Sequence, residues 1–284
     1  GLEPNKRISN RQWNSIPQQQ KNLVVELALE CPHLSSRELA YKLTDEQQIF
    51  ISESSVYRIL KARGLITAPA HIFLSAADEF TNKTGFVHQM WQTDFTYFKI
   101  LGWGWYYLST VLDDYSRYIV HWELCPGMKA EDVKRTIDNA IVKARIKTKQ
   151  RPRLLSDNGS CYISSALETY LKKNHNIDQV HGRPMHPQTK GKIERYHRTM
   201  KNVVKLDNYY SPEELEKALD VFVNRYNNER YHESLQNLTP ADVYYGRADA
   251  ILNERKRIKI RDLKQRRMQY QKLKLKENKK LMYI

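Results

Sequence analysis

Residues 91–101 read WQTDFTYFKIL, a stretch dominated by aromatic and β-branched side chains. Such side chains pack well on a pleated surface, so the stretch predicts a strand near the middle of a sheet. It also contains Asp94, and burying an unpaired carboxylate is costly. Two interpretations follow: either Asp94 points out of the sheet toward water, or it is positioned to bind a cation.

The pattern on the C-terminal side of this stretch predicts an α/β domain. Strands are expected over 92–101, 105–112 and 115–124, and their short connections favour an antiparallel meander. Further strands are expected over 153–156 and 177–180, alternating with helices over 130–146, 163–171 and about 190–204; one more helix starts at Ser211 and runs to about 226. This order predicts a mixed five-stranded sheet flanked by helices.

The N-terminal segment predicts three short helices. The first covers 17–30, the second opens with a capping box at Ser35, and the third is expected to begin at Ser54 and to end near Gly64. Two short helices followed by a basic one favour a helix-turn-helix over a plain three-helix bundle with a solvated basic face. The third-helix residues expected to contact DNA are Arg58, Lys61 and Arg63.

Composition points to a polyanionic partner. The 284 residues include 47 basic and 32 acidic side chains, a formal net charge of +15, and such an excess favours nucleic acid. No apolar run approaches the roughly 20 residues that span a bilayer, so the protein is expected to have no membrane contact and to be cytoplasmic. The three cysteines are far apart, which argues against a disulfide framework or a cysteine zinc site.

Four segments are predicted from these patterns. They are a helix-turn-helix domain over 1–66, a linker over 67–88, a catalytic core over 89–246 and a basic, partly helical tail over 247–284. The tail carries fourteen lysines and arginines against four acids. It is therefore interpreted as an arm that grips DNA rather than as a solubilising face.

Three acids occupy positions that could converge. Asp94 lies in the first strand, Asp157 follows the fourth, and Glu194 lies in the helix that opens with KGKIERYHR. Carboxylates brought together repel one another unless cations neutralise them, and their hard oxygens suit Mg²⁺ or Mn²⁺. Two such ions can activate an attacking oxygen and stabilise a leaving oxygen at phosphorus. Alternatively, Asp157 only starts a turn and Glu194 only pairs with Arg198.

The surroundings of Glu194 favour phosphate binding. Arg198 and Lys201 share its helix face, while Lys190 and Lys192 lie at the helix start, where the helix dipole attracts anions. These four cations are predicted to contact DNA. The pair Asp113 and Asp114 competes for a metal role, but its place between two hairpin strands favours a turn.

Five motifs in order carry a resemblance to a known family: WQTDFTYF, VLDDYSRYIV, LLSDNGS, HPQTKGKIERYHR and YNNERYHESLQNLTPADVYYG. They resemble the integrase-core transposases of bacterial insertion sequences, in particular the second reading-frame product of copy-out-paste-in elements, which are relatives of retroviral integrases. The resemblance covers 91–246, and SVYRILKARGLI resembles the helix-turn-helix that precedes the core in the same family.

The resemblance implies an RNase H-like fold and a DDE triad formed by Asp94, Asp157 and Glu194. Asp94 would bridge two metal ions, and Asp157 and Glu194 would each hold one of them. The 36 residues between Asp157 and Glu194 are one more than the family usually shows. The loop over 182–188 is the simplest place for this extra residue.

The implied reaction has two steps. Water cleaves a phosphodiester at an insertion-sequence end and frees a 3′-hydroxyl, which then attacks a second phosphodiester and joins the strands. The implied partners are double-stranded DNA, as element ends and target, and a second copy of the chain or more, since two ends must be held together. An additional N-terminal transposase region is also expected in this family. The alternatives are a non-catalytic DNA-binding protein or regulator derived from a transposase, a nuclease that cuts without joining, and an RNA-binding protein.

Overall fold

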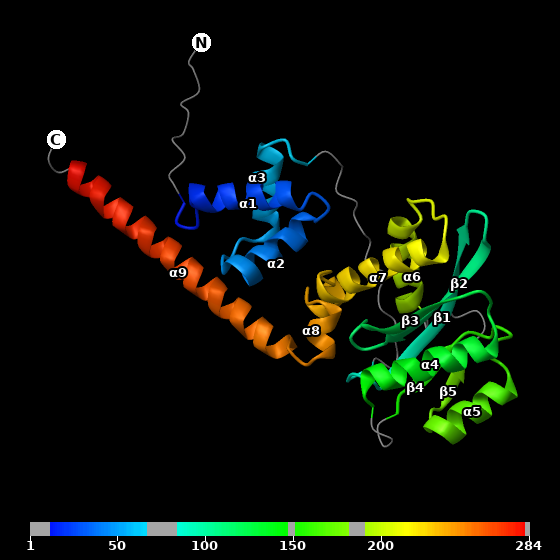
Figure 1. Cartoon of the computed structure of the whole chain (residues 1–284). Helices are drawn as coiled ribbons and strands as arrows, with labels where there is room; N and C mark the ends of the chain where they lie inside the picture. Colours follow the sequence, from blue (N-terminus) through cyan, green and yellow to red (C-terminus); the bar gives the residue numbers. More distant parts are fainter. Residues whose placement is uncertain (1–11, 67–83, 147–150, 182–190, 282–284) are drawn as a thin grey trace, which may run out of the picture. The chain divides into compact units, whose positions relative to one another are not determined.

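The computed structural model describes residues 12–66, 84–146, 151–181 and 191–281 (Figure 1). Contacts between residues divide the chain into two compact units. The sheet unit is Leu74–Gly246, and the helical unit combines Gly1–Phe73 with Arg247–Ile284. The predicted segment boundaries stay a prediction, and most of the predicted linker lies outside the described residues.

A five-stranded mixed sheet forms the centre of the sheet unit. Its strands are β1 (Met90–Ile100), β2 (Gly104–Asp113), β3 (Ile119–Cys125), β4 (Arg153–Ser156) and β5 (Gln179–His181), in the spatial order β3-β2-β1-β4-β5. The first three pair antiparallel, while β4 pairs parallel with both β1 and β5. The predicted meander and the predicted mixed sheet are therefore confirmed.

Helices cover both faces of this sheet. The first face packs against α4 (Ala130–Ala144) and α5 (Ser165–His175), and the second against α6 (Gly191–Val204) and α7 (Pro212–Asn228). A 3-10 turn (Glu233–Leu235) and α8 (Pro240–Tyr244) complete the unit. Successive residues of a strand point to opposite faces, and β1 follows this rule: Trp91 packs on the α4 face, whereas Phe98 and Ile100 pack on the α6 face.

The third strand starts later than predicted. It begins at Ile119 instead of residue 115 because the preceding turn is fixed by buried acids. The Asp113 carboxylate accepts hydrogen bonds from the Ser116 backbone N–H (2.8 Å), the Ser116 hydroxyl (2.6 Å) and the His88 N–H (2.8 Å). Burial raises the pKa of Asp113, and these hydrogen bonds oppose that shift. The predicted turn role of this acid is thus confirmed.

Three helices form the N-terminal part of the helical unit: α1 (Gln18–Glu30), α2 (Ser36–Gln47) and α3 (Glu53–Ala62). The capping box predicted at Ser35 is present, and Gly64 has a φ of 67°, as a left-handed helix end requires. The predicted cap at Ser54 is wrong, since α3 begins after Ser52. Three helices are present as predicted, and their use as a helix-turn-helix stays a prediction.

The basic C-terminal segment is one 34-residue helix, α9 (Ala248–Leu281), that belongs to the helical unit. Arg255 of α9 donates two hydrogen bonds to the carboxylate of Asp45, at 2.7 and 2.6 Å. Asp262 accepts the Phe50 backbone N–H at 2.8 Å, and Arg266 donates to the Phe50 carbonyl at 2.6 Å. The expected partly helical tail is therefore a helix docked on the segment between α2 and α3.

No described helix of the chain has both the length and the low charge that crossing a lipid bilayer would require.

The docking of α9 can be measured by hydrogen exchange. Because Asp262 accepts the Phe50 N–H, and a hydrogen bond to a charged group contributes about 1.5 to 3 kcal/mol, we expect Asp262→Ala to speed amide exchange at Phe50 by roughly tenfold or more. Asp249→Ala, which removes an exposed acid from the first turn of the same helix, serves as the control. Equal exchange at Phe50 in both variants would contradict the docked arrangement.

Candidate active site

The register of β1 and β4 brings two of the predicted acids to one edge of the sheet. Trp91 lies opposite Leu154, and Gln92 lies opposite Leu155. Continued by two residues, the same parallel register sets Asp94 level with Asp157, which directly follows the last residue of β4. Two acids from separate motifs therefore lie near each other, Asp94 within β1 and Asp157 just past the end of β4.

Tyr162 gives an independent sign that these two carboxylates are neighbours. Its side chain is almost completely buried. Burial is the largest cause that raises the pKa of the Tyr162 phenol, and the charges of Asp94 and Asp157 both raise it further. Both carboxylates thus act on one buried hydroxyl group, which stays neutral at physiological pH.

Asp157 also has the turn role that its sequence suggested. One of its carboxylate oxygens accepts the Gly159 N–H at 2.9 Å. A Cβ atom at position 159 would lie 2.8 Å from that oxygen, which is closer than real Cβ contacts allow. A larger residue at this position would therefore displace the Asp157 carboxylate, whereas glycine leaves it in its hydrogen bond at the end of β4.

Asp94 faces α6 instead of open solvent. Residues two apart in a strand point to the same face, so Asp94 shares the α6 face with Phe98 and Ile100. Its side chain is 19% exposed, and one carboxylate oxygen lies 3.5 Å from Nδ1 of His197 in α6. Asp94 therefore lies against a helix inside the fold, and the interpretation in which it points out of the sheet into bulk water is wrong.

A buried polar network holds the start of α6 against β1. The Gln92 side-chain oxygen accepts the Ile193 backbone N–H at 3.1 Å, and its amide nitrogen donates to Asp114 at 2.7 Å. Asp114 in turn pairs with the Lys192 ammonium at 2.5 Å, with side-chain exposures of 4% and 12%. First-turn N–H groups have no partner within their own helix, so Gln92 supplies one from a strand.

This network corrects the prediction that Lys192 contacts DNA phosphates. Its ammonium donates to both the carboxylate and the backbone carbonyl of Asp114. Burial is the main cause that lowers the pKa of Lys192, and Asp114 opposes this shift. Lys192 is therefore a buried structural cation that secures the helix start.

Glu194 lies on the exposed side of α6, directly after the residue that Gln92 holds. Within the described ranges, no three histidine, cysteine or acidic side chains lie close enough together to hold a metal ion. The register thus sets Asp94 near Asp157, and the part of Glu194 in the site stays a prediction. The loop 182–188, in which we expected the extra residue, lies outside the described residues.

The other predicted DNA contacts have different surroundings. Arg198 is exposed, and Lys190 lies outside the described residues. The Lys201 ammonium lies 4.9 Å from the centre of the Tyr97 ring, and its pKa is lowered by desolvation and then by Lys205, against the effect of Asp94. In the helical unit, the exposed predicted contacts are Arg58, Lys61 and Arg63.

Sequence reasoning missed three residues of this region. Gln92, Tyr162 and His197 are all buried, and each touches or acts on a predicted acid or its helix. A signal was present for two of them. Gln92 is two residues from Asp94, and His197 is one helical turn from Glu194, so both share a face with an acid.

The Lys192–Asp114 pair allows a stability test. Removing one partner of a buried ion pair leaves the other charge uncompensated, so we expect Lys192→Met to lower the free energy of unfolding by about 3 to 5 kcal/mol. The double variant Lys192→Met/Asp114→Asn should recover part of that loss. Denaturant unfolding measures both, with Lys173→Met at an exposed position as the control. A Lys192→Met variant as stable as the control would show that the pair contributes nothing.

Known proteins match this chain in the sheet unit. An Integrase core domain family model matches residues 87–187, and a second model with the same description matches residues 175–240. Transposase InsF for insertion sequence IS3A, from Escherichia coli K12, is 31% identical over 93 residues. That alignment covers 32% of this chain and 30% of InsF.

A solved structure supports the same fold. The simian T-cell lymphotropic virus intasome, in complex with a PP2A regulatory subunit, contains a chain that superposes with a TM-score of 0.50 and 18% sequence identity. The superposition covers 78% of this chain and 74% of that one. With the mixed sheet flanked by helices, this confirms the expected RNase H-like fold. Through residues 87–240, the chain belongs to the integrase core family.

Proposed function

We propose that this protein is a DNA transposase that cleaves a phosphodiester at the end of an insertion sequence and then joins the freed 3′-hydroxyl to another strand. The observation that carries the proposal is the β1–β4 register, which sets Asp94 level with Asp157. The similarity to transposase InsF and the integrase core family supports it. A dedicated protein nucleophile is not needed, because water and then a DNA hydroxyl serve as nucleophiles.

Divalent cations fit the donor atoms of this site. Asp94 and Asp157 offer hard carboxylate oxygens at the sheet edge, and Mg²⁺ or Mn²⁺ prefers such ligands. Two ions, when bound, would activate the attacking oxygen and stabilise the leaving oxygen. Asp94 and Asp157 would hold them, with Glu194 as the third ligand. The proposal therefore requires the Glu194 carboxylate to join the aspartates when the site is assembled.

Residues around the acids supply the remaining functions. The Tyr162 phenol lies in the core on the α4 face, and its pKa is raised by burial and then by the charges of both carboxylates, so it adds no charge to the site. The network of Gln92, Asp114 and Lys192 keeps the first turn of α6, and with it Glu194, close to β1. Arg198 and Lys201 follow Glu194 at helical spacing and would bind DNA phosphates beside the acids.

The proposed partner is double-stranded DNA, both as element ends and as target. Lys190 and the α3 residues Arg58, Lys61 and Arg63 are further proposed phosphate contacts. Since two ends must be held together, a homodimer or a larger assembly is proposed. The aligned segment spans only 30% of InsF. An additional N-terminal transposase region, as implied by the family resemblance, is also part of the proposal.

A non-catalytic DNA-binding protein derived from a transposase is the second candidate. One observation favours it: in the described part of the chain, no three acidic, histidine or cysteine side chains form a metal-sized cluster. The two candidates differ in a single property, which is the appearance of cleaved and joined DNA.

The deciding experiment is a Mg²⁺-dependent assay on labelled DNA that carries the element's own ends. Glu194→Gln keeps the size of the side chain but removes its charge. Loss of a metal ligand removes several kcal/mol of transition-state stabilisation, so we expect cleavage and joining to fall by about 100-fold or more. Binding to the same DNA should be retained. Glu168→Gln, an exposed acid of α5, is the matched control and should stay active.

Two other results would change the conclusion. A fully active Glu194→Gln variant would remove Glu194 from the site and leave the third ligand to another residue. A wild-type protein that binds the ends but neither cleaves nor joins them under Mg²⁺ or Mn²⁺ would favour the non-catalytic candidate.

A further inference from the structure

The charges of α9 are divided sharply between its buried and exposed sides. Between Arg255 and Lys276 the helix has one acid, Asp262, and it is buried together with Arg255 and Arg266. Every other charged residue of this stretch is basic and exposed. These nine cations are Lys256, Arg257, Lys259, Arg261, Lys264, Arg267, Lys272, Lys274 and Lys276.

The buried charges attach α9 to the N-terminal helices. Arg255, Asp262 and Arg266 follow one another at spacings of seven and four residues, so they form one stripe of the helix. They bind Asp45 and both backbone polar groups of Phe50. Ile258, which is 2% exposed, adds an apolar contact to this stripe. Bidentate pairs of this kind fix orientation as well as proximity, so the exposed cations are held in a defined position relative to α2 and α3.

Most of the exposed cations of α9 take no part in docking the helix. Lys264, Lys272, Lys274 and Lys276 make no ion pair with any side chain that the structure describes, a set that ends at Lys276. Like charges this close repel one another, and Glu254, which lies 3.6 Å from Arg257, relieves only part of this repulsion. A helix with this pattern gains stability when a polyanion neutralises it.

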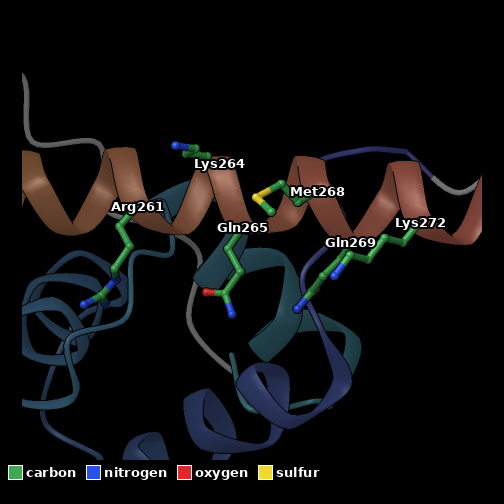
Figure 2. Close-up of a pocket in the computed structure, with 6 residues that line it drawn as sticks. All are labelled: Arg261, Lys264, Gln265, Met268, Gln269 and Lys272. Carbon is green, nitrogen blue, oxygen red and sulfur yellow. The ribbon is translucent and has the colours of Figure 1, made fainter.

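One side of α9 carries a depression beside the docking stripe, and its Arg261 also donates a hydrogen bond to the Gln48 carbonyl. A shallow depression of about 360 Å³ lies along it, lined by Arg261, Lys264, Gln265, Met268, Gln269 and Lys272 (Figure 2). The lining residues are three cations, two side-chain amides and one methionine, with no acid, and most of the surface that they expose in the depression comes from apolar side-chain atoms. Cationic and amide N–H groups are the usual donors to phosphate oxygens of nucleic acids. From Lys256 to Lys276 the helix is about 30 Å long at 1.5 Å per residue, close to one turn of B-form DNA at roughly 34 Å.

We propose that the face of α9 around Lys264 and Lys272 binds the phosphate backbone of double-stranded DNA. With α3, this face would form one DNA-binding surface of the helical unit. This inference rests on the proposed function for the identity of the nucleic acid. It deepens that function by assigning a second contact surface to the helical unit. Phosphate contacts position a protein without reading sequence, so this face adds affinity and orientation, and α3 is left to read bases.

Two variants of α9 with the same charge change test the assignment. Lys264→Gln/Lys272→Gln alters the proposed face. Lys256→Gln/Lys274→Gln alters a neighbouring face of the same helix: these two lysines are five helical turns apart and lie about 80° around the helix from Lys264 and about 160° from Lys272. All four lysines are exposed and none takes part in docking, so the fold should be unaffected. Circular dichroism and the exchange rate at Phe50 verify this.

The measurement is the dissociation constant of the full chain for two labelled duplexes, one with an element end and one of scrambled sequence, as a function of KCl concentration. A plot of the logarithm of the association constant against the logarithm of the salt concentration falls with a slope set by the number of phosphate contacts. Each lost contact makes this plot less steep by about 0.9. We expect Lys264→Gln/Lys272→Gln to make this plot less steep by roughly 1.8 on both duplexes. The same variant should weaken binding on the order of tenfold or more at 0.1 M salt. The Lys256→Gln/Lys274→Gln control should change the slope by less than half as much.

Several outcomes would overturn the inference. If wild type and Lys264→Gln/Lys272→Gln share one slope, α9 does not contact phosphate through this face. Equal losses in both lysine pairs would mean that the charge of α9 acts without a defined face. If the protein binds double-stranded RNA of the same sequence more tightly than DNA, RNA and not DNA is the partner of this face. These arms need no catalysis, so a protein that binds as expected but never cleaves DNA would refute the proposed enzymatic function and leave the binding face intact.

Discussion

The Gln92 side chain makes the interaction on which the sheet unit depends. It is completely buried, and an amide buried without partners costs about 1 to 3 kcal/mol for each unmade hydrogen bond. Its oxygen accepts the Ile193 N–H, while its nitrogen donates to Asp114. Because Asp114 also pairs with Lys192, one side chain joins β1, the turn after β2 and the first turn of α6. Only this arrangement of the three elements satisfies all of these groups.

The position of the acids follows from this constraint. Gln92 points to the α6 face, and Asp94, two residues later, points to the same face. A shift of β1 by one residue would turn Asp94 to the α4 face and leave Gln92 without the helix start. The parallel pairing of β1 with β4 determines the position of Asp157, because the register continued by two residues sets it beside Asp94. The register that fixes the buried network thus also positions the two aspartates of the proposed metal site.

The sequence predicted this region well where the signals were local or periodic. The aromatic and β-branched side chains of residues 91–101 predicted β1, whereas the role of the three acids stays a prediction. Sequence reasoning failed where partners lie far apart in the chain. Lys192 looked like a free cation because Asp114, its partner, is 78 residues away. Likewise, α9 looked like a tail because Asp45, the partner of Arg255, is separated from it by 210 residues.

Net charge identifies a class of partner, whereas the burial of each charge identifies the surface. The basic excess of the last 38 residues is compatible with a mobile arm, a solvated helix or a fixed binding face. In an arm or a solvated helix, acids and bases have no reason to separate by side. In α9 the acid that lies between Arg255 and Lys276 is buried against the Phe50 amide, and the exposed surface of that stretch carries cations alone. Such a division is expected when one side of a helix serves folding and the other serves a polyanion.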